Sequence, residues 1–187
     1  MKKIAVLLFI LLTLKLPSVA QIDDYDLLYY QAQKCDVKLM HDIDPFQDEE
    51  YQKYAWSPYP LYRTSSYMYF KDITIPPGYY LLTPRKLKGI DYVLFKSAGK
   101  VKYIIPAVKK ETVPIDFYQK QMPVPKQTKW QKFTKNVKDK FYSTFKSSKK
   151  IPPPKAFIDF KPEGRYFIIK LYYGDDCYVM AFRKNQY

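Results

Sequence analysis

The residues with the clearest chemical potential in this chain are two cysteines, Cys35 and Cys177, and a single histidine, His41. Cys35 and His41 have the residue types of a nucleophile and its general base. They stand six residues apart, on or just beyond one expected helix, whereas the partners in cysteine proteases come from distant segments that the fold brings together. The motifs H-E-x-x-H and G-x-S-x-G and a glycine-rich phosphate loop do not occur. The sequence therefore predicts no catalytic residue, no metal site and no cofactor.

Carboxylates gather just after His41, where Asp42, Asp44, Asp48 and two glutamates fall within nine residues. A calcium loop of the EF-hand type would need a glycine that is missing here, and Pro45 follows the second acid of the group. The segment is interpreted as a solvated acidic linker or as a docking partner for a lysine-rich segment further along the chain. Any two carboxylates can converge in a fold, so hydrolysis of an envelope polymer stays open as a minor alternative.

Residues 1–20 have the three-part pattern of a secretory signal peptide. Lys2 and Lys3 form a cationic start, residues 4–14 are almost entirely apolar, and small residues precede an expected cleavage after Ala20. The apolar run is too short to span a bilayer, which takes about 20 residues. Cleavage would leave 167 residues with a net charge of +11. We expect an exported protein, periplasmic or extracellular, soluble or peripheral to a membrane, with no transmembrane segment in its mature chain.

Export to an oxidising compartment would change the expected state of the two cysteines. An even number of cysteines in an oxidising compartment favours a Cys35–Cys177 disulfide. The bridge would close a loop of about 140 residues and would contribute up to about 5 kcal/mol in the chain-entropy model. Two buried free thiols are the alternative.

The charge of the chain is distributed unevenly. Residues 21–55 carry nine acidic residues and three lysines, and the pattern predicts an N-terminal helix that begins near Asp23 and is followed by an irregular connector. In that helix Leu28, Ala32 and Cys35 would share one face. Residues 56–187 carry nine acidic and 26 basic residues, a net charge of +17. An acidic N-terminal piece thus precedes a basic body, and the two are expected to attract each other.

The body, residues 56–187, is rich in tyrosine, β-branched residues and proline, which favours short strands. Strands are expected at 67–75 and 79–83. A hairpin is expected at 90–105 around a turn at Gly99, and a second one spans 156–173 and leads into a strand at 177–182. The predicted fold class is α+β, with about six to eight short antiparallel strands in a small barrel or a sandwich, an N-terminal helix and an inserted basic amphipathic helix.

The inserted segment at about 118–155 contains eleven lysines and one acidic residue. A capping-box pattern begins at Thr128 and three prolines follow at 152–154, so we expect a helix of about twenty residues between them. Aromatic and apolar side chains recur on one face of this helix, within an arc of about 120°, and lysines occupy the rest. The expected packing face consists of Trp130, Phe133, Val137, Phe141 and Phe145. The candidate contacts to an anionic surface are Lys129, Lys132, Lys135, Lys138, Lys146 and Lys149.

These patterns predict a non-enzymatic envelope protein that contacts an anionic surface, such as lipid headgroups, lipopolysaccharide or a wall polymer, through its basic helix. The alternative is a structural or accessory subunit that docks on an envelope protein through the aromatic face of the helix. Nucleic acid is not an expected partner, because no nucleic-acid-binding signature occurs and an exported chain rarely meets one.

Overall fold

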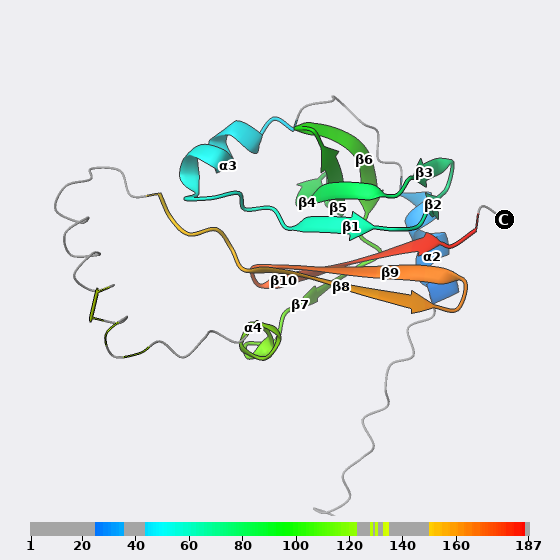
Figure 1. The fold of residues 1–187 in the computed structure, drawn as a ribbon. Helices are drawn as coiled ribbons and strands as arrows, with labels where there is room; N and C mark the ends of the chain where they lie inside the picture. The colour runs from blue at the N-terminus through cyan, green and yellow to red at the C-terminus, as the bar shows by residue number, and fades with distance from the viewer. Residues whose placement is uncertain are drawn as a thin grey trace, which may run out of the picture.

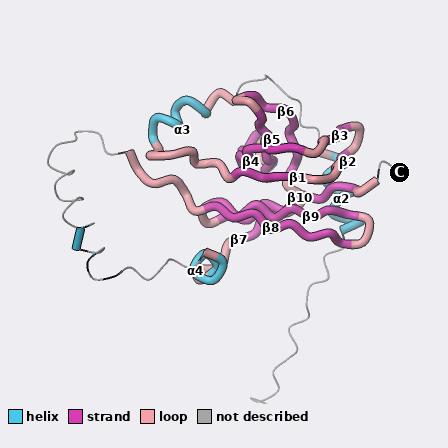
Figure 2. The backbone as a smooth tube through the Cα atoms, viewed as in Figure 1, coloured by secondary structure: helices cyan, strands magenta, loops and turns pink. Residues whose placement is uncertain are grey.

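The computed structural model of the chain describes residues 25–35, 44–122, 128, 130, 133–134 and 150–185. The expected signal peptide, residues 1–20, lies outside them. The described part is α+β, with two antiparallel sheets stacked as two layers and short helices around them (Figures 1 and 2).

The first sheet has four antiparallel strands in the order β1-β4-β5-β6. Their bounds are β1 (Leu61–Thr64), β4 (Gly78–Leu87), β5 (Ile90–Ser97) and β6 (Lys100–Pro106). The hairpin of β5 and β6 confirms the strongest turn prediction. Its two turn residues, Ala98 and Gly99, have φ values of 50° and 75°. Two successive positive φ values are typical of the type I′ turn, whose twist matches that of the flanking strands.

The second sheet has six strands, and β10 lies at its centre (Figure 1). β10 pairs with β9 along its whole length, while its other edge is shared by β7 and β2. β7 pairs near the start of β10 and β2 pairs at its last residue, Arg183. β3 continues the sheet beyond β2, and β8 continues it beyond β9. The bounds are β2 (Met68–Phe70), β3 (Ile73–Ile75), β7 (Lys109–Thr112), β8 (Ala156–Glu163), β9 (Tyr166–Tyr173) and β10 (Asp176–Arg183).

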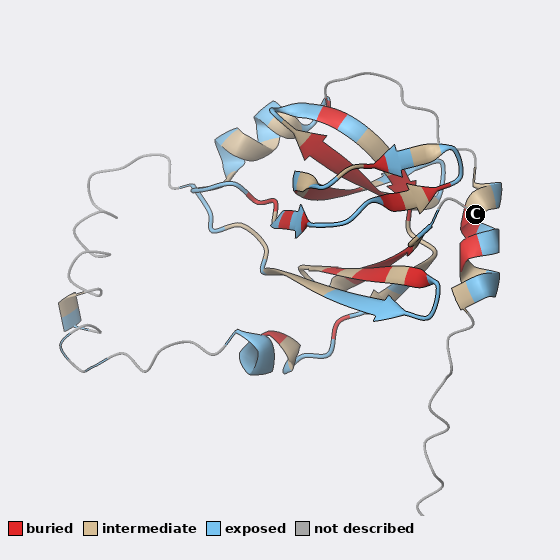
Figure 3. Ribbon diagram, turned by 45° about the vertical axis from the view of Figure 1, so that its right-hand side comes forward, coloured by how far each residue is buried: buried red, intermediate tan, exposed pale blue. Residues whose placement is uncertain are grey.

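Aromatic side chains fill the space between the two sheets. The rings of Phe95 (β5) and Phe182 (β10) meet edge to face with centroids 5.9 Å apart, and those of Tyr62 (β1) and Phe160 (β8) are 6.4 Å apart. Edge-to-face pairs suit the quadrupoles of aromatic rings and add to the stabilisation that burial provides. The buried residues in Figure 3 lie mainly on the strands of both layers. Of the two predicted architectures the sandwich is confirmed, and the described strands form no closed barrel.

The described residues form ten strands, more than the six to eight expected. One reason is a break in the expected strand 67–75, because Lys71 takes a positive φ of 51° and turns β2 into the hairpin with β3. A second difference is that β4 continues through Pro84, where the expected strand stopped. Proline is tolerated there because β1 begins at Leu61, opposite Leu81, so none of the described strands lies beside Pro84 on the edge away from β5.

The predicted N-terminal helix is confirmed as α2 (Tyr25–Lys34), which packs on β10 and buries Ala32, as expected. Its main anchor is Tyr29, whose ring contacts Phe70 and Tyr166 with centroids 5.8 and 5.3 Å away. The connector that follows is not entirely irregular, because it contains α3 (Gln47–Lys53). A short helix, α4 (Phe117–Gln121), stands at the start of the lysine-rich segment, outside the predicted helix.

Candidate functional site

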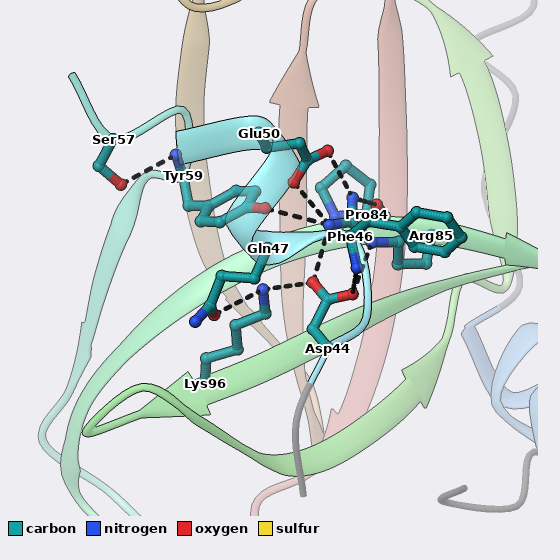
Figure 4. A network of polar contacts seen from close by, with 9 residues as sticks. All are labelled: Asp44, Phe46, Gln47, Glu50, Ser57, Tyr59, Pro84, Arg85 and Lys96. Atoms are coloured by element: carbon teal, nitrogen blue, oxygen red, sulfur yellow. Dashed lines mark hydrogen bonds and ion pairs between the residues drawn. The ribbon is translucent and has the colours of Figure 1, made fainter. Parts of the chain in front are cut away.

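A network of charged side chains joins the acidic N-terminal piece to the first sheet (Figure 4). Asp44 lies in the turn before α3, and Glu50 lies in α3. Their partners are Arg85 of β4 and Lys96 of β5. Side chains alternate along a strand, and Phe95, the residue before Lys96, packs against Phe182 of the other sheet. The network therefore lies on the outer face of the four-stranded sheet, beneath α3.

Asp44 is the centre of this network, and its side chain is only 1% exposed. Its backbone carbonyl accepts a hydrogen bond from the amide of Gln47 (3.1 Å), and its Oδ1 accepts one from the amide of Phe46 (3.3 Å). These local bonds form the turn that leads into α3, a role that aspartate side chains often take. The same carboxylate accepts bonds from Arg85 and from Lys96, so one residue both shapes the turn before α3 and attaches that turn to the sheet.

Arg85 binds both acidic residues at once. Its Nη2 lies 2.7 Å from Oδ2 of Asp44 and 2.6 Å from Oε2 of Glu50, and its Nη1 lies 3.0 Å from Oε1 of Glu50. A bidentate guanidinium–carboxylate pair is among the stronger polar contacts in proteins. Nη2 also donates to the hydroxyl of Tyr59 at 3.0 Å. The fork of the guanidinium is thus fully engaged within the protein.

Lys96 is buried as completely as Asp44, with 1% of its side chain exposed. Its ammonium group contacts Oδ2 of Asp44, donates to Oε1 of Gln47 at 3.2 Å and lies 4.3 Å from the centre of the Tyr59 ring. A buried lysine is stable only with such partners. Lys96 is therefore a structural cation, out of reach of a substrate in solution.

Burial and ion pairing act against each other on the ionisation of this network. Burial disfavours the charged form of Asp44, but hydrogen bonds and charges from Arg85 and Lys96 outweigh it and hold the pKa of this carboxyl below its usual value. Burial lowers the pKa of Lys96, although Asp44 opposes the effect. Burial also opposes the charge of Arg85, but its carboxylate partners raise its pKa. We take the network as ionised at neutral pH because two cations face Asp44.

A pocket of about 480 Å³ opens beside the network. It lies where α3, β4, the start of β5, β7 and β10 meet, and Arg85 and Glu50 form part of its wall. Its lining combines four cationic, three acidic and three aromatic side chains with one proline. The remaining lining residues are Phe46, Glu49, Lys53, Tyr54, Pro84, Lys86, Asp91, Lys110 and Tyr178.

Most of the residues predicted for the inserted helix, its surface contacts and its packing face, lie outside the described residues. This holds for all six candidate lysines, Lys129, Lys132, Lys135, Lys138, Lys146 and Lys149, and for Val137, Phe141 and Phe145 of the expected packing face.

Two members of that face, Trp130 and Phe133, are described and have helical backbone. They are 76% and 65% exposed, and their rings meet edge to face at 6.5 Å. The hydroxyl of Thr134 donates to the carbonyl of Trp130 at 3.1 Å, as on a helical turn. Both aromatic side chains are thus largely exposed.

The structure leaves both cysteines as free thiols, so the expected disulfide is not formed. The carbonyl of Cys35 accepts a hydrogen bond from Nζ of Lys71 in the turn between β2 and β3, while Cys177 stands near the start of β10, opposite β7. β2 joins β10 only at Arg183, six residues or about 20 Å along the strand from Cys177. A disulfide needs Cα atoms within about 7 Å. Cys177 is buried, which raises its pKa to about 11.

The ion network was not predicted from the sequence, although two signals pointed toward it. Lys96 ends an apolar run within the predicted hairpin, where a buried lysine calls for a carboxylate partner. The acidic segment was recognised, but as a solvated linker or as a partner of the lysine-rich segment. His41 and Asp42 lie outside the described residues.

The described residues contain no group of three or more histidine, cysteine or acidic side chains arranged to hold a metal ion. In the same part of the chain no helix has the length and apolar character that a membrane span requires. Comparisons of the chain with protein-family models, with curated proteins and with solved structures found no match.

Proposed function

We propose that this protein is an exported, non-enzymatic binding module whose β-sandwich holds a lysine-rich segment against an anionic surface of the cell envelope. The observation that supports this proposal most is the exposure of Trp130 and Phe133, 76% and 65%, within a segment that has eleven lysines and one acidic residue. Exposed aromatic side chains surrounded by lysines are typical of segments that bind at a membrane interface.

The estimated free energy of binding to an anionic surface suits a reversible contact. Each lysine near an anionic surface contributes about 1 kcal/mol, so five or six of them contribute about 5 kcal/mol. Partial burial of two large aromatic side chains adds about 3 kcal/mol. Before ordering costs, the total of about 8 kcal/mol corresponds to a dissociation constant of about 1 μM. Charge supplies more than half of this, so binding should weaken strongly as salt is added.

Co-sedimentation with vesicles tests the proposal. Vesicles of phosphatidylglycerol and phosphatidylcholine should retain the mature protein at low ionic strength, and vesicles of phosphatidylcholine alone should not. Replacing Lys132, Lys135 and Lys138 by glutamine should reduce retention. A matched variant that replaces three exposed lysines on the hairpins of the first sheet should bind like the wild type; it carries K88Q, K100Q and K102Q. Equal loss in both variants, or equal retention on both vesicle types, would contradict the proposal.

The same exposed aromatics also favour a second candidate function, docking on an envelope protein. Apolar docking should persist at high ionic strength and should depend on Trp130 and Phe133 more than on the lysines. A W130A/F133A variant that still binds anionic vesicles in a salt-sensitive manner would exclude the aromatic pair as the main contact and would favour a purely electrostatic one.

A further inference from the structure

The pocket beside the ion network differs from the network itself in containing cations that are not held in ion pairs within the described part of the chain. Lys53 on α3 and Lys86 on β4 are both exposed and line the pocket, and the described residues provide no ion-pair partner for either ammonium group. Arg85 is held by Asp44 and Glu50, and Lys110 lies 3.0 Å from Asp176. Among the lining acids Glu49 is exposed, and Asp91 stands opposite Lys86 in the β4–β5 register and lies 4.0 Å from Lys110. The lining thus carries four cations and three acids, an excess of positive charge that favours an anion.

Three of the cations that line the pocket each lie close to an aromatic ring. The guanidinium of Arg85 lies 5.6 Å from the ring centre of Phe46, and Lys110 lies 5.3 Å from that of Tyr178. The ammonium group of Lys53 lies 5.5 Å from the ring centre of the neighbouring Tyr54. Such a lining offers apolar ring surface and positive charge side by side. A bare anion uses only the charge, whereas a sugar ring that carries an acidic group uses both.

The pocket is firmly built and of suitable size. Its volume of about 480 Å³ falls within the usual range for small-molecule sites, about 300–1,000 Å³. The wall formed by Arg85 and Glu50 is fixed by the charged network, so little ordering is needed when a ligand enters.

The lysine-rich segment ends at the rim of this pocket. The amide of Ile151 donates to the carbonyl of Lys53 at 3.1 Å, and the amide of Ala55 donates to the carbonyl of Ile151 at 2.9 Å. Lys150 donates from its ammonium group to the carbonyl of Tyr51 at 3.1 Å. The described end of the lysine-rich segment, Lys150 and Ile151, therefore lies beside Lys53 on α3.

From this geometry we infer that the pocket binds an acidic saccharide unit, a sugar ring that carries a carboxylate or phosphate group, with Lys53 and Lys86 holding the anion. The inference rests on the proposed function in one respect, namely that the protein works among anionic polymers of the envelope. It adds a defined site in the sandwich that recognises one unit of such a polymer.

Isothermal titration calorimetry of the mature protein at low ionic strength tests the inference with four probes. Digalacturonate and glucose 6-phosphate carry both a sugar ring and an anion, lactose carries only rings, and inorganic phosphate only the anion. Each of the first two should bind at least about tenfold more tightly than lactose or phosphate. If only one of them does, the difference identifies carboxylate or phosphate as the recognised group.

Variants locate the binding. Lys53→Gln and Lys86→Gln should each weaken the binding of the acidic sugar about tenfold, since each removes one charge-assisted hydrogen bond. The matched K100Q/K102Q variant, which removes two exposed lysines from the hairpin of β5 and β6, should bind like the wild type. Lys53 and Lys86 are exposed, so the unfolding temperatures of both variants should stay unchanged and report intact folding.

Three results would overturn the inference: no binding of either acidic sugar, equal affinity for inorganic phosphate and acidic sugars, or unchanged affinity in both pocket variants. These results are distinguishable from a failure of the proposed function. Vesicle binding should survive K53Q and K86Q and should be lost with the lysines of the inserted segment.

Discussion

Replacing Asp44 by asparagine should destabilise the protein far more than an ordinary surface substitution. The carboxylate accepts hydrogen bonds from Lys96, from two nitrogens of Arg85 and from the amide of Phe46, and it is 1% exposed. Asparagine keeps the size of the side chain but removes the charge and turns an NH2 group toward the cations. Arg85 still has Glu50, whereas Lys96 keeps only Gln47 and the Tyr59 ring.

The expected loss of unfolding free energy comes from the ammonium group of Lys96, which stays buried without its carboxylate partner. Removing one partner of a buried ion pair costs about 3–5 kcal/mol, because the other ion remains desolvated. For a chain of this length that corresponds to a fall in Tm of about 10 °C. Urea unfolding followed by circular dichroism measures the free energy, and a thermal melt measures Tm.

Two further variants make the measurement specific. Asp48→Asn removes an exposed carboxylate from the first turn of the same helix and should cost less than about 1 kcal/mol. The double variant D44N/K96M removes the stranded cation together with its partner, so it should be more stable than D44N alone. This account of the network would be refuted if the unfolding free energy of D44N lay within about 1 kcal/mol of the wild-type value. It would also be refuted if the destabilisation of D44N/K96M equalled the sum of those of D44N and K96M.

Three other expectations can be tested on the same protein. Because Arg85 and Lys96 hold the pKa of Asp44 below its usual value, this group contributes stability that should be fully present above about pH 4, the pKa of an aspartate in the unfolded chain. That stability should be lost as the pH falls through the lower pKa of the folded state. Urea titrations in acid should show this loss for the wild type and not for D44N. Iodoacetamide should label Cys35 in the native protein and reach Cys177, which is 1% exposed, only in denaturant; failure of both thiols to react in denaturant without reductant would instead reveal a disulfide. Tyr29→Ala should lower the unfolding free energy by about 3–4 kcal/mol, because it removes the ring that anchors α2. Tyr29→Phe should lower it by only about 1 kcal/mol, because it removes a single hydrogen bond from the amide of Lys71. Equal losses of the two variants in urea unfolding would contradict the assigned packing role.

Local patterns in the sequence were sufficient for the elements whose stability is local. The β5–β6 hairpin follows from alternating β formers around a glycine turn, and α2 follows from its acidic start and apolar spacing. Both predictions use contacts between residues close in the chain. The choice between a barrel and a sandwich depends on pairings between distant strands, such as β2 and β7 on one edge of β10, and the sequence left it open.

The site depends on long-range contacts that no local pattern reports. Asp44 and Lys96 are 52 residues apart, and Asp44 and Arg85 are 41 apart. A cluster of acidic residues is usually solvated, so the pattern alone favoured a linker. The apolar run before Lys96 signals its burial, but which carboxylate it meets depends on the placement of α3 over β5. The expected disulfide failed for a similar reason, since an even cysteine count carries no information on distance.

The most direct test of the central claim, that the lysine-rich segment contacts an anionic surface, is the fluorescence of Trp130. The chain has two tryptophans, so Trp56→Phe leaves Trp130 as the only one. Titration with vesicles that contain phosphatidylglycerol at low ionic strength should shift its emission to the blue, and about 0.5 M salt should reverse the shift. Unchanged emission with anionic vesicles, or the same shift with neutral phosphatidylcholine vesicles, would contradict the claim.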